Sequence, residues 1–158
     1  MQISLTPIGI VHSPFADPEG MPIQAAFSDA VGRLEIYAEY VDGLRDIEGF
    51  DFVTLLYQFH MTGKESLRVT PFLDDEPRGV FATRAPTRPN RIGMSVVRLL
   101  GVTGNMLDIG NVDIVSGTPV IDIKPYVPAF DSRTGCRVGW FTGKLDRAAS
   151  VRADERMR

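Results

Sequence analysis

The sequence is poor in the residues that form disulfides, metal centres and covalent intermediates. Its 158 residues include one cysteine, Cys136, and two histidines, His12 and His60. A single cysteine excludes a disulfide within the chain, and neither histidine has a second histidine or a cysteine at the spacing of a zinc site. The G-x-S-x-G nucleophile motif and the G-x-G-x-x-G dinucleotide motif are both absent from the sequence. We therefore expect no metal, no disulfide and no doubly wound nucleotide-binding domain.

Long hydrophobic runs are also missing. No apolar run approaches the ~20 residues that a transmembrane helix needs. The N-terminal MQISLTPIGIV lacks the positive charge that begins a signal peptide. The net charge of −3 argues against a surface that is basic all over. These absences lead us to expect a cytoplasmic protein with no membrane segment.

The sequence does contain a series of short segments rich in β-branched and aromatic residues, each bounded by Gly, Pro, Asn or Asp. One further segment, residues 38–50, has apolar residues at helical spacing and predicts a helix. Gly104 and Asn105 predict the turn of a hairpin over residues 103–111. The predicted strands are residues 3–11, 32–38, 50–59, 79–83, 93–102, 105–115 and 119–127.

Strands without strand–helix alternation predict an all-β fold, a single closed or nearly closed β-barrel with one short helix. Along the chain, we expect a barrel domain over residues 1–131. Residues 132–158 are charged and Gly-rich, which predicts a C-terminal tail, frayed or briefly helical at its end, and no second domain.

The connection FATRAPTRPNRIGMS, residues 81–95, combines prolines with arginines. Pro86 and Pro89 restrict the backbone around them, so that neighbouring guanidinium groups are held in place before a ligand arrives. Such groups suit carboxylates, phosphates and nucleobases. A proline-rich connection whose arginines are simply solvated is the alternative.

A second polar pattern occurs in VSGTPVIDIKPYVPAFD, residues 115–131. Strand alternation places Asp122, Lys124 and Tyr126 on one face, with Ile121 and Ile123 on the other. A carboxylate, an ammonium and a phenol together can bind a polar ligand or move a proton. The first two can equally form a surface ion pair of little energetic value.

Four stretches together resemble the TsaA-like (YaeB/TrmO) family: TPIGIVHSPF, FDFVTLLYQFH, GVFATRAPTRPNRIGMSVVRL and GTPVIDIKPY. Members are S-adenosylmethionine-dependent enzymes that methylate N6 of threonylcarbamoyladenosine at position 37 of tRNA. The resemblance extends over residues 5–131. It implies a TsaA-like β-barrel, a homodimer, tRNA as partner, and S-adenosyl-L-methionine bound near the barrel mouth and the dimer seam.

The resemblance also implies site residues. Arg84 and Met94 would form one wall of the cofactor slot, and Arg88, Arg91 and Arg98 would face the RNA backbone. Because an N6 attached to a carbonyl is a poor nucleophile, a base is expected. The candidates for this base are Asp122, Tyr126 and His60, with Asp122 first because it shares a face with Lys124. We assign catalysis to Asp122, Lys124 and Tyr126. The complete set of implied cofactor contacts is Ile23, Gln24, Ala25, His60, Met61, Arg84, Met94, Asp113, Ile114, Val115 and Ser116.

The chain departs from the family pattern in three places. MPIQAAF lacks the basic residue and the proline common there, and Ser116 occupies the position of a usual acidic residue. We also expect no counterpart of the additional C-terminal domain of longer bacterial members. The alternatives are a methyltransferase of the same fold acting on a small molecule or another RNA site, and a non-enzymatic cofactor-binding module.

Overall fold

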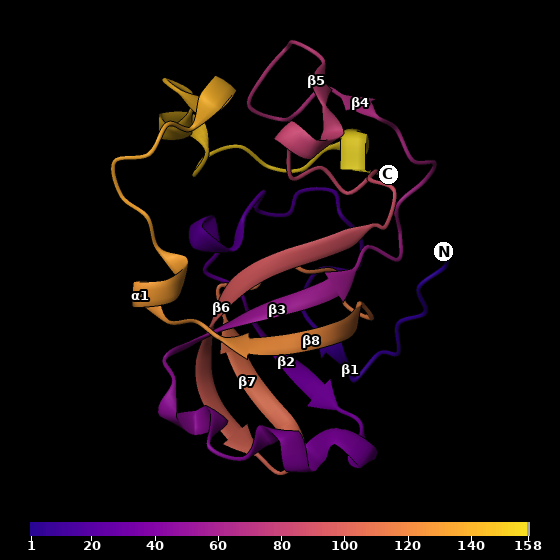
Figure 1. Cartoon of the computed structure of the whole chain (residues 1–158), viewed down its shortest axis with the longest axis vertical. Coiled ribbons are helices and arrows are strands. Elements are labelled where there is room, and N and C mark those ends of the chain that lie inside the picture. Colours follow the sequence, from indigo (N-terminus) through magenta and orange to yellow (C-terminus); the bar gives the residue numbers. More distant parts are fainter. Residues whose placement is uncertain (158) are drawn as a thin grey trace.

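Six strands close into an antiparallel barrel in the computed structural model, which describes residues 1–157 (Figure 1). The strands follow one another around the barrel in the order β1-β2-β7-β6-β3-β8. This confirms the predicted all-β barrel. The bounds are β1 (Gly9–His12), β2 (Val31–Ile36), β3 (Phe52–Gln58), β6 (Ile92–Thr103), β7 (Met106–Gly110) and β8 (Pro119–Pro125).

The barrel interior is filled by alternate residues of each strand, as the two-residue period of a strand requires. On β3, Val53, Leu55 and Tyr57 are buried, whereas the residues between them point outward. Leu34 of β2 and Val97 of β6 are likewise fully buried. Removing these side chains from water is the main source of the barrel's stability.

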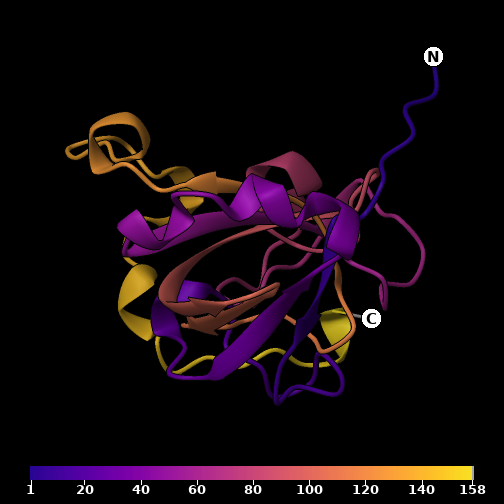
Figure 2. The same ribbon diagram turned by 90° about the horizontal axis from the view of Figure 1, so that it is seen from below.

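One end of the barrel is covered by the 3₁₀-helices η2 (Ala38–Leu44) and η3 (Ile47–Gly49), which lie below the strands in Figure 1 and in the foreground of Figure 2. The prediction of one continuous helix over residues 38–50 is therefore wrong. The apolar residues at helical spacing nevertheless face one side, because Leu44 and Ile47 both pack on the core. Asp46 has a φ of 68°, in the left-handed region, and this interrupts the helical backbone.

Several predicted strands are shorter than expected. The strand predicted over residues 3–11 begins only at Gly9, and residues 79–83 form mainly the 3₁₀-helix η4 (Val80–Ala82). The strand predicted over 105–115 ends at Gly110, because Asn111 adopts a φ of 58° and turns the chain away. The turn at Gly104 and Asn105 is confirmed, since β6 ends and β7 begins on either side of it.

A β-bulge breaks the expected alternation of β8. Leu56 lies opposite Asp122 but Tyr57 lies opposite Val120, so Ile121 is the extra residue. As a result Val120 and Ile123 both pack on the core, in place of the predicted pair Ile121 and Ile123.

The other end of the barrel carries two further pieces of chain that lie side by side in Figure 1. One is the small hairpin β4 (Arg68–Val69) and β5 (Arg78–Gly79). The other is the C-terminal segment, residues 132–157, which packs back on the barrel through the buried Ala148 and Ala153. The remaining helices are η1 (Ala25–Phe27), α1 (Pro128–Asp131), η5 (Gly139–Phe141), η6 (Leu145–Arg147) and η7 (Glu155–Met157).

The C-terminal segment is tied to the N-terminal part of the chain. The Ala153 amide donates to the Met21 carbonyl at 2.8 Å, and Pro22 and Arg152 form an isolated β-bridge. Arg158, the last residue of the predicted tail, lies outside the described residues, and a domain boundary at residue 131 stays a prediction. Within residues 1–157, the helices are all too short or too polar to cross a bilayer.

Candidate cofactor and proton-transfer site

Three side chains joined by hydrogen bonds lie at the barrel end that carries the C-terminal segment. The Tyr57 hydroxyl is 3.0 Å from Ser95 Oγ, and Ser95 Oγ donates to Asp113 Oδ1 at 2.6 Å. Tyr57 comes from β3, Ser95 from β6, and Asp113 from the loop that follows β7. The pairing of β3 with β6 brings the first two together, because Tyr57 is opposite Gly93 and Leu55 is opposite Ser95.

Gly93 makes the position of the Tyr57 ring possible. A Cβ at residue 93 would lie 2.3 Å from Tyr57 Cε2 and 2.9 Å from Phe59 Cζ, so that any side chain there would force the two rings to shift. Phe59 completes the packing with an edge-to-face contact, its ring centroid 5.4 Å from that of Tyr57. The absence of a side chain at residue 93 therefore allows two aromatic rings to lie against the strand.

Burial has the largest effect on the pKa values of Tyr57 and Asp113. It raises the pKa of Asp113 to about 6, although the Ser95 hydroxyl, the Ala25 amide and the Arg84 guanidinium act in the opposite direction. Burial, with the Asp113 carboxylate second, holds the pKa of Tyr57 well above its ordinary value. The phenol therefore stays protonated and donates to Ser95, which donates to Asp113. A carboxyl with a pKa near neutrality can accept or release a proton under physiological conditions.

Two adjoining cavities share Tyr57, Phe59 and Asp113 in their walls. The larger has a volume of about 190 Å³ and the smaller about 30 Å³. Nine of the eleven predicted cofactor contacts line them: Ile23, Gln24, Arg84, Met94 and Asp113 in the larger, and His60, Met61, Asp113, Ile114 and Val115 in the smaller. The structure thus gathers residues that lie far apart in the sequence.

The other two predicted contacts, Ala25 and Ser116, line neither cavity but make hydrogen bonds next to this site. Ala25 donates its backbone N–H to the Asp113 carboxylate. Ser116 Oγ accepts a hydrogen bond from the Ser13 amide at 3.3 Å, so its hydroxyl fixes the N-terminal loop.

Polar groups around the cavities are positioned by neighbours. Arg84 Nη1 donates to Gln24 Oε1 at 2.8 Å, which leaves its other N–H groups for a ligand. His60 Nδ1 lies 3.2 Å from Thr118 Oγ1, and burial lowers the pKa of His60, so the imidazole is neutral at physiological pH. Within residues 1–157, no cluster of three side chains suited to a metal ion occurs.

The predicted catalytic residues lie elsewhere. Asp122 and Lys124 form an ion pair at 2.7 Å on the outer face of the barrel, and Tyr126 contacts Phe52 there edge to face. Leu56 separates Asp122 from Met94 across the sheet, so two strand spacings, about 10 Å, lie between them. The proline–arginine segment and β8 therefore flank the same strand, but these three side chains do not line either cavity.

The three arginines expected to face RNA differ in their surroundings. Arg88 donates to the carbonyls of Thr83 and Ala85, both at 3.1 Å, and so braces its own loop rather than extending outward. Arg91 precedes β6 with a φ of 50°. Arg98 is exposed on the outer face of β6.

Sequence reasoning missed Tyr57 and Ser95. The available signal was a polar residue at an inward position of each alternating strand, Tyr57 two places after Leu55 and Ser95 two places before Val97. That signal does not identify a partner, because the register that joins the two strands is a property of the folded barrel.

The fold and the site define a β-barrel protein that can hold a polar small molecule, at a barrel mouth with one near-neutral carboxyl. Residues 10–132 match the family described as tRNA-methyltransferase O N-terminal domain. The chain belongs to this family, which confirms the resemblance found in its motifs.

Two relatives and one solved structure illustrate the similarity. The S-adenosyl-L-methionine-binding protein of Archaeoglobus fulgidus is 46% identical over 127 residues, 80% of this chain and 91% of its own. The tRNA (adenine(37)-N6)-methyltransferase of Escherichia coli is 40% identical over 136 residues, 79% of this chain and 58% of its own. The crystal structure of TrmO from Pseudomonas aeruginosa superposes with a TM-score of 0.75 at 38% identity, over 89% of this chain and 63% of that one. This chain therefore spans less than two thirds of the length of the last two proteins.

Proposed function

We propose that this protein is an S-adenosyl-L-methionine-dependent methyltransferase that methylates N6 of threonylcarbamoyladenosine at position 37 of tRNA. The family and the activity named for the Escherichia coli relative support the reaction. The single observation that carries it is the position of Asp113. Its carboxyl, with a pKa of about 6, lies in the common wall of the two cavities that the predicted cofactor residues line.

The side chains present fit the chemistry of this cofactor. An anionic Asp113 suits a sulfonium or ammonium cation, and the free N–H groups of Arg84 suit a carboxylate. The rings of Tyr57 and Phe59 offer an apolar surface to an adenine. When bound, the cofactor supplies a methyl group on a positively charged sulfur.

The residues of this chain then have to orient the acceptor nitrogen and remove its proton. We assign proton acceptance to Asp113 rather than Asp122. Asp113 is in the cavity wall and titrates near neutrality, whereas Asp122 is held by Lys124 on the outer face. Proton transfer from N6 to the Asp113 carboxylate leaves a neutral acid, which Ser95 and Tyr57 hold in position through their hydrogen bonds.

The outer face of β3, β6 and β8 is the surface that we assign to a second copy of the chain. Met94 and Ile92 are large apolar side chains exposed on β6, and Phe52 is exposed on β3. Exposed apolar residues on one sheet face favour association. The homodimer implied by the family resemblance would bring Asp122, Lys124 and Tyr126 of this face to the seam. For tRNA we assign Arg91, because Arg98 lies on the outer face of β6 that we assign to the second copy.

The decisive experiment is mass spectrometry of tRNA nucleosides from cells with and without this protein. Loss of the N6-methylated threonylcarbamoyl nucleoside on deletion, and its return with the wild-type gene but not with Asp113→Asn, is the expected result. Asp122→Asn provides the comparison between the two carboxylates. Unchanged nucleosides would refute tRNA as the substrate.

A second candidate function is cofactor binding without methyl transfer, because the Archaeoglobus fulgidus relative is named only for binding. Filter binding of labelled tRNA at rising salt separates a tRNA enzyme from a methyltransferase of small molecules, since a protein that contacts phosphates loses affinity steeply as salt rises. Methyl transfer from labelled cofactor to any RNA would exclude the binding-only function.

A further inference from the structure

A third cavity, of about 400 Å³, lies between the C-terminal segment and the β4–β5 hairpin, and we call it the C-terminal cavity. Its walls are mainly apolar and aromatic, and they come from distant parts of the chain. The C-terminal contribution lies outside residues 10–132, the part that matches the family. Side chains that define the cavity are Phe27, Phe72, Trp140, Phe141, Leu145 and Ala148.

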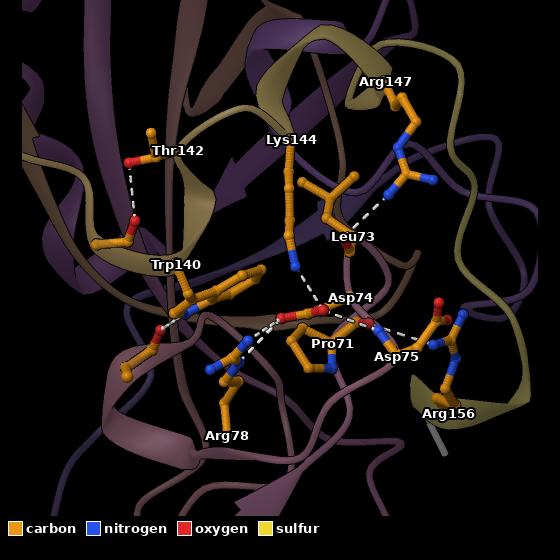
Figure 3. Close-up of polar contacts among 12 residues, drawn as sticks. Pro71, Leu73, Asp74, Asp75, Arg78, Trp140, Thr142, Lys144, Arg147 and Arg156 are labelled. Atoms are coloured by element: carbon orange, nitrogen blue, oxygen red, sulfur yellow. Dashed lines mark hydrogen bonds and ion pairs between the residues drawn. The ribbon is translucent and has the colours of Figure 1, made fainter.

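The C-terminal wall is fixed by polar contacts with residues 74–82 (Figure 3). Asp74, buried at 8% exposure, accepts from Lys144 at 2.5 Å and from Arg78 at 2.6 Å. The Trp140 indole N–H donates to the Ala82 carbonyl at 2.7 Å. Lys144 and Arg78 together hold the pKa of Asp74 well below its ordinary range. The wall is therefore in place before any ligand binds.

This cavity adjoins the cavity of about 190 Å³ that Asp113 lines. Ile23, Gln24, Thr83 and Arg84 line both of them. Arg84 lies at the junction with its guanidinium bonded to Gln24, and within residues 1–157 it takes part in no ion pair. A ligand in the C-terminal cavity can thus place an apolar, planar part among the aromatic rings and direct a polar edge past Arg84 toward Asp113.

We propose that the C-terminal cavity receives the acceptor purine base, with Trp140 of the C-terminal segment as its stacking wall. This inference rests on the proposed methyl transfer. A base must leave its stack to reach an active site, and proteins receive such bases by stacking on aromatic side chains. The cavity offers those rings, and it shares Arg84 with the cavity that Asp113 lines, so N6 would point toward Arg84.

The single tryptophan of the chain gives a direct binding signal. The full chain is first saturated with S-adenosylhomocysteine and then titrated with N6-threonylcarbamoyladenosine, while Trp140 fluorescence is recorded. We expect little change with the first compound and saturable quenching with the second. Quenching by S-adenosylhomocysteine alone, with nothing added by the nucleoside, would assign the cavity to the cofactor and overturn the inference.

Steady-state kinetics with a tRNA anticodon stem-loop test the stacking role. Trp140→Leu should raise the KM for RNA by about 5- to 150-fold, the range for one stacked base, while the cofactor Kd stays unchanged. Trp140→Phe should retain most of the affinity. Both variants lose the bond to Ala82, so their difference reports the aromatic ring, which also stacks on Phe141 with ring centroids 3.9 Å apart. Phe81→Leu is the matched control, because Phe81 is 76% exposed and lines none of the three cavities described.

The results separate this inference from the proposed function. Quenching by the nucleoside without methylation of any RNA would support the cavity and refute the enzyme. Methylation with an unchanged KM in Trp140→Leu would refute the cavity and leave the enzyme standing. Thermal unfolding of each variant verifies that the C-terminal segment still packs.

Discussion

Replacing Asp113 by asparagine should change how stability depends on pH. The pKa of Asp113 rises on folding from 3.8 to about 6, and each unit corresponds to about 1.4 kcal/mol. An acid that binds its proton more tightly when folded favours folding at low pH. The wild-type protein should therefore lose about 3 kcal/mol of Asp113's contribution as the pH rises from about 4 to about 7.

An asparagine side chain cannot ionise, so Asp113→Asn lacks this loss. The difference in unfolding free energy, variant minus wild type, should be about 3 kcal/mol larger at about pH 8 than at about pH 4. In a protein of this length, that corresponds to about 6–12 °C in Tm. Other acids, such as the strongly ion-paired Asp74, are present in both proteins and cancel in the difference.

Thermal unfolding followed by circular dichroism across this pH range is the assay. Ser95→Ala provides a second test, since loss of its hydroxyl removes a hydrogen bond that lowers the pKa of Asp113. The pH dependence should then move to higher pH. A difference that does not vary with pH, or that is larger in acid, would refute the reasoning.

Three other outcomes are expected. Gly93→Ala should destabilise the protein by about 1–3 kcal/mol through overpacking against Tyr57, whereas Gly101→Ala, with its nearest neighbour at 3.9 Å, should change the Tm little; equal effects of the two substitutions would contradict the packing account. Burial lowers the pKa of His60, so its ring-proton NMR signal should titrate below about pH 6.5, and a midpoint above that value would be inconsistent with burial. Asp74→Ala should speed amide hydrogen exchange in residues 139–148 but not in the barrel strands, because it frees the contacts that fix the C-terminal segment; unchanged exchange there would show that apolar packing alone is sufficient. The depressed pKa of Asp74 means that its stabilising contribution is present above about pH 4 and is lost only in stronger acid.

The sequence predicted the barrel because strand patterns are local. Residues 50–59, 93–102 and 119–127 became β3, β6 and β8 with small shifts of their ends. Local patterns also misled where they were ambiguous. Residues 38–50 have helical spacing but form short 3₁₀-helices. Residues 79–83 have the composition of a strand but form mainly a 3₁₀-helix.

Motif resemblance located the cofactor residues, yet it did not reveal their chemistry. Asp113 was expected as one contact among eleven, and its role as a near-neutral carboxyl depends on burial, which outweighs the opposing effects of Ser95, Ala25 and Arg84. Asp122 was chosen because alternation placed it beside Lys124 on one face. Alternation indicates which residues share a face, but it does not say which face meets a cavity.

From the sequence alone came the class of fold, the family and the stretches that gather at the barrel mouth, since each is written in contiguous residues. The tertiary structure decided which groups meet. Tyr57 and Ser95 are 38 positions apart and Ser95 and Asp113 are 18 apart, so their contact depends on strand register and loop path. The same holds for Trp140, which reaches Ala82 across 58 positions. Such distances close only when the whole core forms, because the free energy that holds them comes from packing throughout the barrel.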